Sequence, residues 1–201
     1  MRDFSVTIFG VGKVGSTIAF SCILRDVCDS IDLIDTEHKA LVSQHSDLIQ
    51  AKETHRRRVK VALPIEPRES DVYVICAGQR RGTNKGSREI LYKENFTTVK
   101  NILEQIKKVR KENSLVLMVT NPSTELSKLA LDYVPLVIPC GNMIDNARLR
   151  LCKVQGPHEK PDIEQKCLDV VNGKGYTNFA ISTEVLLRIN QWRSGLDCLY
   201  L

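Results

Sequence analysis

The sequence contains no apolar run that approaches the length of a membrane-spanning helix. Its seven cysteines, at positions 22, 28, 76, 140, 152, 167 and 198, include no CxxC pair, which argues against a zinc site or a redox motif. The odd count, together with cysteines inside apolar segments, indicates reduced thiols rather than a disulfide framework. We therefore expect no bound metal and a reducing compartment.

Aromatic residues are scarce, at 5% of the chain, and none is interleaved with the basic run HRRR at residues 55–58. Nucleic-acid sites combine basic charge with stacking rings, so we interpret this run as a solvated loop and expect no nucleic-acid partner. The net charge of +5 suits an acidic substrate or a phosphate-bearing cofactor. The N-terminal residues lead directly into an apolar segment, which leaves no room for a targeting peptide and predicts a cytoplasmic protein.

The most informative stretch runs from Val6 to Asp35. An apolar run, VTIF, meets the motif GVGKVG at residues 10–15, and an apolar helical pattern and a second strand, IDLID, follow. In such a motif the first glycine allows a tight turn, the second admits a diphosphate, and the third lets the helix pack on the strand. Free N–H groups and the positive end of the helix dipole attract the phosphates. Asp35 can bind an adenosine ribose and would repel a 2′-phosphate, which predicts NAD rather than NADP. The alternative is a glycine-rich turn that binds nothing.

Strand-like and helix-like segments alternate along the chain. We expect strands at residues 5–9, 31–34, 58–62, 72–76, 115–119 and 136–139, and helices at 14–25, 36–52, 89–113 and 123–133. This alternation predicts an α/β fold with a doubly wound parallel Rossmann sheet, strand order 3-2-1-4-5-6, and a ligand crevice at the carboxyl ends of the strands. The pattern weakens beyond residue 139, where we expect helices at 142–154, 162–171 and 182–192. These segments are too short for a second domain with its own core.

Residues suited to chemistry follow the predicted strands. Ala77 and Gly78 close the fourth strand, Asn121 follows the fifth, and Asp145 and Arg148 follow the sixth at a spacing that places both on one helix face. An arginine in a crevice can bind a carboxylate through two parallel hydrogen bonds. Each residue also has an ordinary structural explanation, such as a helix cap or a surface ion pair. Their joint occurrence at successive strand ends favours a site.

The sequence resembles the lactate/malate dehydrogenase family, and most closely its L-lactate dehydrogenases, over most of residues 6–150. The matching stretches are FGVGKVG, IDLID, VICAGQRRGTNKGSR, KENF, VTNPSTEL and GNMIDNARLR, with KGYTNFAIS further along. The resemblance implies an oxidoreductase of carboxylic acid metabolism, which transfers a hydride between a 2-hydroxy acid such as lactate and its 2-oxo acid, pyruvate. It implies NAD as the cofactor, bound by the following residues: Gly10, Val11, Gly12, Lys13, Val14, Gly15, Asp35, Ala77, Gly78, Asn95 and Asn121.

The resemblance also implies catalytic roles. Arg88, at the end of a polar loop, would close over the substrate and polarise its carbonyl, and Asn121 would hydrogen-bond the same oxygen. Arg148 would clamp the substrate carboxylate, while Asp145 would orient a catalytic histidine and stabilise its protonated form. Thr177 would border the substrate pocket.

One part of the family pattern is missing. The family's proton donor is a histidine in a Gly-x-His-Gly-Asp motif, which this sequence lacks, and the chain between Arg150 and Asp169 is much shorter than in the family. His158 is the one histidine placed late enough to replace it, and we interpret it as a solvated loop residue. Loss of a positioned acid typically lowers a rate by ~10²–10⁴-fold. Residues 1–141 would then form the NAD-binding domain, and residues 142–201 a remnant of the substrate domain.

Three hypotheses stay open at this point. The first is a shortened dehydrogenase, the second a non-catalytic NAD-binding or subunit-interaction protein, and the third a truncated product that does not accumulate in folded form. The choice between lactate and malate is open as well, because the discriminating position falls in an uncertain register around residues 80–82. The family is usually oligomeric, so a homo-oligomer is an expectation, although its contacts draw partly on the missing segments.

Overall fold

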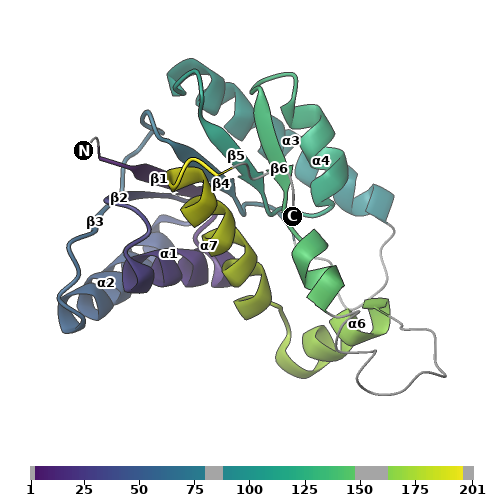
Figure 1. Cartoon of the computed structure of the whole chain (residues 1–201). Helices are drawn as coiled ribbons and strands as arrows, with labels where there is room; N and C mark the ends of the chain where they lie inside the picture. The colour runs from purple at the N-terminus through teal and green to yellow at the C-terminus, as the bar shows by residue number, and fades with distance from the viewer. Residues whose placement is uncertain (1–2, 80–87, 148–162, 197–201) are drawn as a thin grey trace.

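The computed structural model of the chain describes residues 3–79, 88–147 and 163–196 (Figure 1). Within them, every strand pairing of the six-stranded sheet is parallel, and the order is β3-β2-β1-β4-β5-β6. The Rossmann order predicted from the alternation of segments is therefore confirmed. The strands are β1 (Ser5–Phe9), β2 (Ser30–Ile34), β3 (Lys60–Ala62), β4 (Val72–Ile75), β5 (Leu115–Met118) and β6 (Leu136–Pro139).

Helices cover both faces of the sheet. In Figure 1, α1, α2 and α7 lie on one face, and α3 and α4 lie on the other. Residues 142–147 are also helical and directly follow β6. The helix bounds are α1 (Lys13–Arg25), α2 (His38–Thr54), α3 (Arg88–Val109), α4 (Ser123–Ala130), α6 (Ile163–Lys174) and α7 (Phe179–Arg193). None of the described helices is both long enough and apolar enough to cross a membrane.

The two faces of the sheet form two separate hydrophobic clusters. Along β4, Val72 and Val74 belong to the cluster beneath α1 and α7, while Tyr73 and Ile75 belong to the cluster beneath α3 and α4. Successive side chains of a strand point to opposite faces, so a strand covered on both sides must be apolar throughout. This is why β4 and β5, in the interior of the sheet, read as continuous apolar runs in the sequence.

Several helix boundaries differ by a few residues from the sequence-based expectation, such as the end of α4 at Ala130 rather than at residue 133, and the structure shows a reason for two of them. Helix α3 ends at Val109 rather than at residue 113, because the Arg110 guanidinium donates to the carbonyl oxygens of Lys111 and Glu112 and closes a turn there. Helix α7 begins at Phe179 rather than at residue 182, so that its first turn already buries Ile181. A local turn thus accompanies the end of α3, while burial against the sheet accompanies the start of α7.

Helix α7 lies beside α1, although more than 150 residues separate them in the sequence (Figure 1). The two helices run in the same direction: Asn178 contacts Thr17 in the first turns of α1, and Arg193 reaches the backbone oxygen of Asp26 at its far end. Val185 and Ile189 are completely buried in the cluster that β1 and α1 share. The C-terminal segment therefore completes the core of the sheet.

Candidate functional site

The glycine motif forms the turn between β1 and α1, and its glycines differ in their surroundings. Gly10 has φ +86°, and a Cβ there would lie 2.5 Å from the backbone nitrogen of Ala77. A Cβ at Gly15 would lie 2.0 Å from the carbonyl oxygen of Gly10. A Cβ at Gly12, by contrast, would meet no atom within 4 Å. Gly10 and Gly15 thus hold the turn together, while the backbone at Gly12 faces open space.

The start of α1 offers hydrogen-bond donors with no internal acceptor. Gly12 is the N-cap residue, no side chain caps the helix, and its first turn contains no acidic residue. The Ser16 N–H donates to the Gly12 carbonyl at 3.0 Å, so the N–H groups before Ser16 remain unpaired within the helix. Together with the positive dipole end, these donors favour an anion beside Gly12.

Asp35 lies at the same turn, just beyond β2. One of its carboxylate oxygens accepts a hydrogen bond from the Val11 N–H at 2.6 Å, and the other accepts one from the Glu37 N–H at 3.0 Å. The Gly10 N–H donates to the Ile34 carbonyl at 2.9 Å, which holds the ends of β1 and β2 together. A carboxylate in this position keeps further lone pairs for a ligand hydroxyl.

Asn95, on α3, is completely buried and lies beneath the carboxyl edge of the sheet. Its Oδ1 accepts from the Gln79 N–H at 2.6 Å, and its Nδ2 donates to the carbonyl oxygens of Gln79 and Asn121 at 3.3 and 2.7 Å. A Cβ at Gly78, where φ is +152°, would lie 2.6 Å from Asn95 Oδ1. The sequence-based assignment placed Asn95 on the cofactor itself, whereas the structure places it under the backbone that follows Ala77 and joins the ends of β4 and β5.

The residues expected to bind substrate lie in three places. Asn121 is exposed at the end of β5, where its peptide bond to Pro122 is cis. Asp145 is exposed in the helical residues 142–147, after β6, and its N–H donates to the Gly141 carbonyl. Arg88 is the exposed first residue of α3 and borders a cavity of about 710 Å³ between α3 and α4. Arg148 and His158 lie outside the described residues.

Two buried charged residues of α7, which the sequence analysis did not single out, approach the same edge. Glu184 is 2% exposed, and its Oε1 accepts from the Gly141 N–H at 3.0 Å, so it ties α7 to the end of β6. Arg188, one turn further, is 3% exposed. Their spacing of four, with Glu184 just before and Arg188 within the apolar run from Val185 to Ile189, was the signal available in the sequence.

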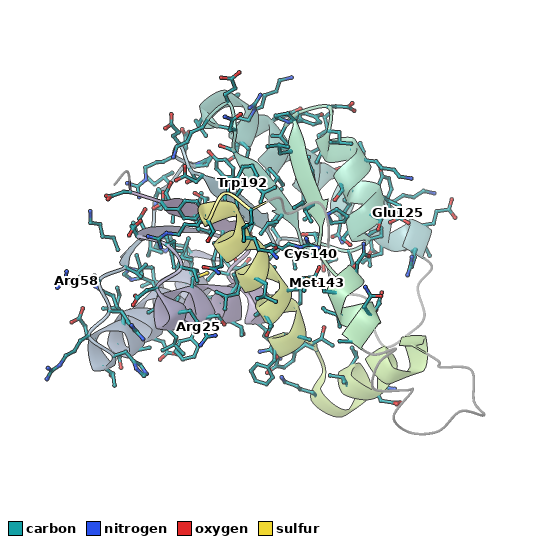
Figure 2. All side chains as sticks on the ribbon, in the orientation of Figure 1. Arg25, Arg58, Glu125, Cys140, Met143 and Trp192 are labelled. Carbon is teal, nitrogen blue, oxygen red and sulfur yellow. The ribbon has the colours of Figure 1, made fainter. Side chains whose placement is uncertain are left out.

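Cys140, labelled in Figure 2, directly follows β6, and both of these charges act on its thiol. Burial raises the pKa of its thiol well above the usual value, the negative charge of Glu184 raises it further, and the positive charge of Arg188 partly opposes both. The pKa of the buried Cys76 thiol, at the end of β4, is also raised by burial. These thiols are therefore protonated and behave as core residues. In the described residues, no group of three or more His, Cys, Asp or Glu side chains could hold a metal ion.

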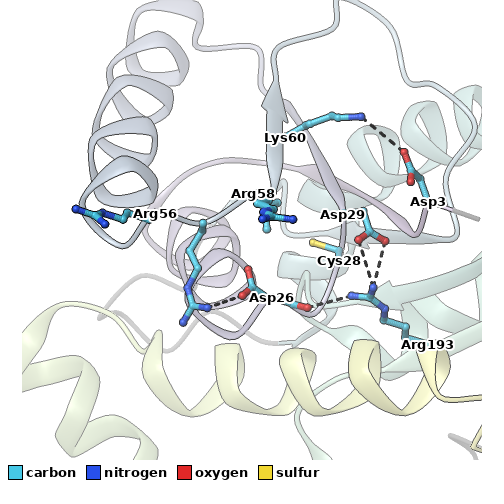
Figure 3. Close-up of a pocket in the computed structure, with 10 residues that line it drawn as sticks. Asp3, Asp26, Cys28, Asp29, Arg56, Arg58, Lys60 and Arg193 are labelled. Atoms are coloured by element: carbon cyan, nitrogen blue, oxygen red, sulfur yellow. Dashed lines mark hydrogen bonds and ion pairs between the residues drawn. The ribbon is translucent and has the colours of Figure 1, made fainter. Parts of the chain in front are cut away.

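The basic run of residues 55–58 lies at the opposite, amino edge of the sheet. There it borders a cavity of about 480 Å³ together with the C-terminal ends of α1 and α7 (Figure 3). Arg57 pairs with Asp26, and Arg193 pairs with Asp29 at 3.2 Å. The interpretation of the run as a solvated loop is therefore wrong for Arg57, which is ion-paired and partly buried.

Helix dipoles explain why cations gather at this amino edge. In a parallel α/β sheet, the helices end where the strands begin, and α1, α2 and α7 end around the cavity. Their partial negative charge stabilises nearby arginines. The basic run thus balances local negative charge and is distant from the glycine turn.

Comparisons with known proteins agree with the geometry of the carboxyl edge. The family model for the lactate/malate dehydrogenase NAD binding domain matches residues 4–135. An L-lactate dehydrogenase of Kosmotoga olearia is 32% identical over 151 residues, which are 72% of this chain and 46% of that protein. A malate dehydrogenase of Aliarcobacter butzleri is 28% identical over 134 residues, 65% of this chain and 42% of that protein. The chain spans about half the length of the curated relatives it matches.

Solved structures show the same fold. The malate dehydrogenase from Archaeoglobus fulgidus, in complex with NADH, superposes with a TM-score of 0.79 at 22% identity, covering 94% of this chain and 77% of that one. The lactate dehydrogenase from Eimeria maxima, with NADH and oxamate, gives a TM-score of 0.77 at 19% identity, covering 95% and 74%.

Proposed function

We propose a function for this chain from its membership of the lactate/malate dehydrogenase family, whose NAD-binding domain it carries. The chain would bind NAD at the carboxyl edge of the sheet and act as an NAD-dependent 2-hydroxy-acid dehydrogenase of the lactate type. The observation that carries this proposal is the turn at Gly12. Open space there adjoins the uncapped first turn of α1, with Asp35 beside it.

The residues of this edge fit the parts of a dinucleotide. Gly12 and the first N–H groups of α1 would receive the diphosphate, because donors and positive dipole converge there. Asp35 would bind the adenosine ribose. Ala77 and Gly78 would pass close to the cofactor, held in place by Asn95, which we assign as a positioning residue. The bound nicotinamide would supply the group that accepts or donates a hydride.

The substrate would lie beyond the nicotinamide, at the ends of β5 and β6. Asn121 would donate a hydrogen bond to the reacting oxygen, and Arg88 would approach it from the start of α3. Arg148 would bind the carboxylate, and Asp145 would stabilise positive charge on a proton donor. Lactate with pyruvate is the proposed pair, supported by the L-lactate dehydrogenases among the relatives, with malate and oxaloacetate as the alternative.

The missing Gly-x-His-Gly-Asp motif favours a second candidate, a catalytically inactive NAD-binding or subunit-interaction protein from the same family. Without a positioned acid, reduction of a ketone leaves an unprotonated alkoxide, so turnover by this chain would be strongly impaired. We further propose that residues 142–201 are the remnant of the substrate domain, that copies of the chain associate, and that it acts in the cytoplasm, where its free thiols would stay reduced.

NADH titration followed by nicotinamide fluorescence tests the cofactor site. The wild-type chain should bind NADH more tightly than NADPH. Gly12→Ala should fold normally, because its Cβ enters open space, yet bind NADH at least about tenfold more weakly, because the methyl group occupies the place of the diphosphate. A folded wild-type chain that does not bind NADH would refute the proposal.

A turnover assay separates the two candidate functions. With NADH and pyruvate or oxaloacetate, measurable loss of nicotinamide absorbance would support the dehydrogenase, and loss at the background rate with NADH bound would support the inactive protein. Because the histidine motif is missing, we expect a rate near background. Robust turnover that His158→Ala abolishes would instead show that this histidine supplies the proton.

A further inference from the structure

The segment between α6 and α7 touches the start of α1, although family resemblance alone assigned it to the substrate side. Lys13 Nζ lies over the ring of Tyr176, 4.0 Å from its centroid. Asn178 is buried, and its Nδ2 donates to Thr17 Oγ1 at 2.9 Å. A stretch far beyond the matched NAD-binding domain thus forms part of the wall beside the glycine turn.

Lys174 places a second ammonium group on the same ring. Its Nζ lies 4.7 Å from the Tyr176 centroid and 3.8 Å from that of Phe179, and it donates to Asn178 Oδ1 at 2.5 Å. Within the part of the chain that the structure describes, neither Lys13 nor Lys174 has a carboxylate partner. Two cations sharing one ring repel each other, and an anion between or beside them would relieve that repulsion.

The surroundings add positive potential rather than neutralise it. The first turn of α1 has no acidic residue and no side-chain cap, and Gly12 leaves the space beside it open. Helix dipole and ammonium charges therefore act in the same direction at this corner. A diphosphate is the ligand group that matches two cations with no carboxylate partner among the described residues, beside N–H groups that have no acceptor within the helix.

We infer that the C-terminal segment completes the diphosphate site: Lys174 and Lys13 bind the two phosphate charges, and Tyr176 holds both ammonium groups in place. The inference rests on the proposed function and extends it, because it gives residues 174–178 a cofactor-binding role. It also explains why this segment packs against the nucleotide-binding half of the molecule.

The test compares Lys174→Gln with the matched control Lys107→Gln. Lys107 also lies over an aromatic ring, 5.6 Å from the centroid of Tyr133, but it belongs to the last turn of α3. Dissociation constants are measured for NADH by fluorescence, and for ADP-ribose and adenosine by competition. Lys174→Gln should weaken NADH and ADP-ribose binding about three- to fivefold, as expected for a partly exposed charge pair. Adenosine binding should not change, Lys107→Gln should behave as wild type, and Lys174→Arg should restore affinity.

Two results would overturn the inference while the proposed function stands: unchanged NADH affinity in Lys174→Gln, or an equal loss for adenosine, which indicates a purely structural effect. A folded wild-type chain that does not bind NADH would overturn both. Circular dichroism establishes that each variant is folded. If Lys174→Gln does not fold, Lys174→Met, which keeps the apolar stem over the rings, takes its place with the same expected losses.

Discussion

The two edges of the sheet differ in whether their polar groups have partners within the protein. At the amino edge, charges are paired: the Asp71 carboxylate binds the Lys111 ammonium and the backbone N–H of Ser5, and Asp29 binds Arg193. At the carboxyl edge, the N–H groups of the first turn of α1, between Gly12 and Ser16, have no acceptor within the helix and no side-chain cap. We infer from this difference that unpaired donors, rather than charge density, mark the edge proposed to bind the cofactor.

Topology is the physical cause of this asymmetry. Each right-handed crossover returns its helix so that the helix begins above the carboxyl end of a strand and ends near the amino end of the next. Free N–H groups therefore collect at one edge and free carbonyl groups at the other. The basic residues at the amino edge offset the partial negative charge of the free carbonyl groups, whereas a bound anion can offset the partial positive charge of the free N–H groups.

The largest expected effect is the loss of stability caused by Gly15→Ala, which disturbs the backbone of the glycine turn at the carboxyl edge. The new Cβ would lie 2.0 Å from the Gly10 carbonyl oxygen, so the turn or the helix must move. We expect a loss of about 3 kcal/mol or more in the free energy of unfolding, measured by urea denaturation and circular dichroism. Gly12→Ala is the matched control and should stay within about 1 kcal/mol of wild type. Equal stability of the two variants would contradict the assigned roles.

Asp71→Asn tests the paired amino edge. Burial alone would raise the pKa of this carboxyl group, but hydrogen bonds from Lys111 and Ser5 outweigh burial, and the pKa is lowered. A lowered pKa stabilises the fold above about pH 4, the usual value of an unfolded aspartate, and this contribution is lost as pH falls through the folded-state pKa. Asp71→Asn should cost about 1–3 kcal/mol at pH 7 and much less at pH 3.

Urea denaturation at both pH values measures this effect, with the exposed Asp47→Asn as control. A cost for Asp71→Asn that does not shrink on acidification would show that the carboxylate charge does not contribute to stability.

Glu184→Ala tests the connection between α7 and the carboxyl edge. It removes the acceptor of the Gly141 N–H and should lower the free energy of unfolding by about 1–2 kcal/mol. Thr183→Ala is the control, because the Thr183 hydroxyl is exposed and bonds only to a carbonyl of its own helix, that of Phe179. If both variants lose the same stability in urea, the hydrogen bond between Glu184 and the Gly141 N–H does not stabilise the packing of α7 on the end of β6.

Arg58→Gln should have the smallest effect. Arg58 is exposed and borders the amino-edge cavity in Figure 3, far from the glycine turn. NADH affinity should stay within about twofold, and stability within about 0.5 kcal/mol. A tenfold loss of NADH affinity in fluorescence titration would contradict the assignment of cofactor binding to the carboxyl edge alone.

Residues that belong to one recognisable motif were the ones whose arrangement could be predicted. Asp35 lies 24 residues after Val11, but the glycine turn and Asp35 are parts of one βαβ unit, and the structure brings them together as expected. Asn95 shows where this reasoning stops. Its three partners belong to residues 16 and 26 positions away, and the pattern of α3 does not reveal which backbone its amide will meet.

The sequence by itself determined the α/β class and the strand order, because apolar periodicity sets the alternation of strands and helices, and right-handed crossovers restrict how parallel strands can be ordered. The glycine spacing predicted the edge that we propose binds the cofactor. Tertiary structure alone decided that Lys13 lies over the Tyr176 ring, that Glu184 holds the end of β6, and that Arg57 is ion-paired. These contacts join segments separated by 31 to more than 150 residues, and only the packing of helices on the sheet brings such segments together.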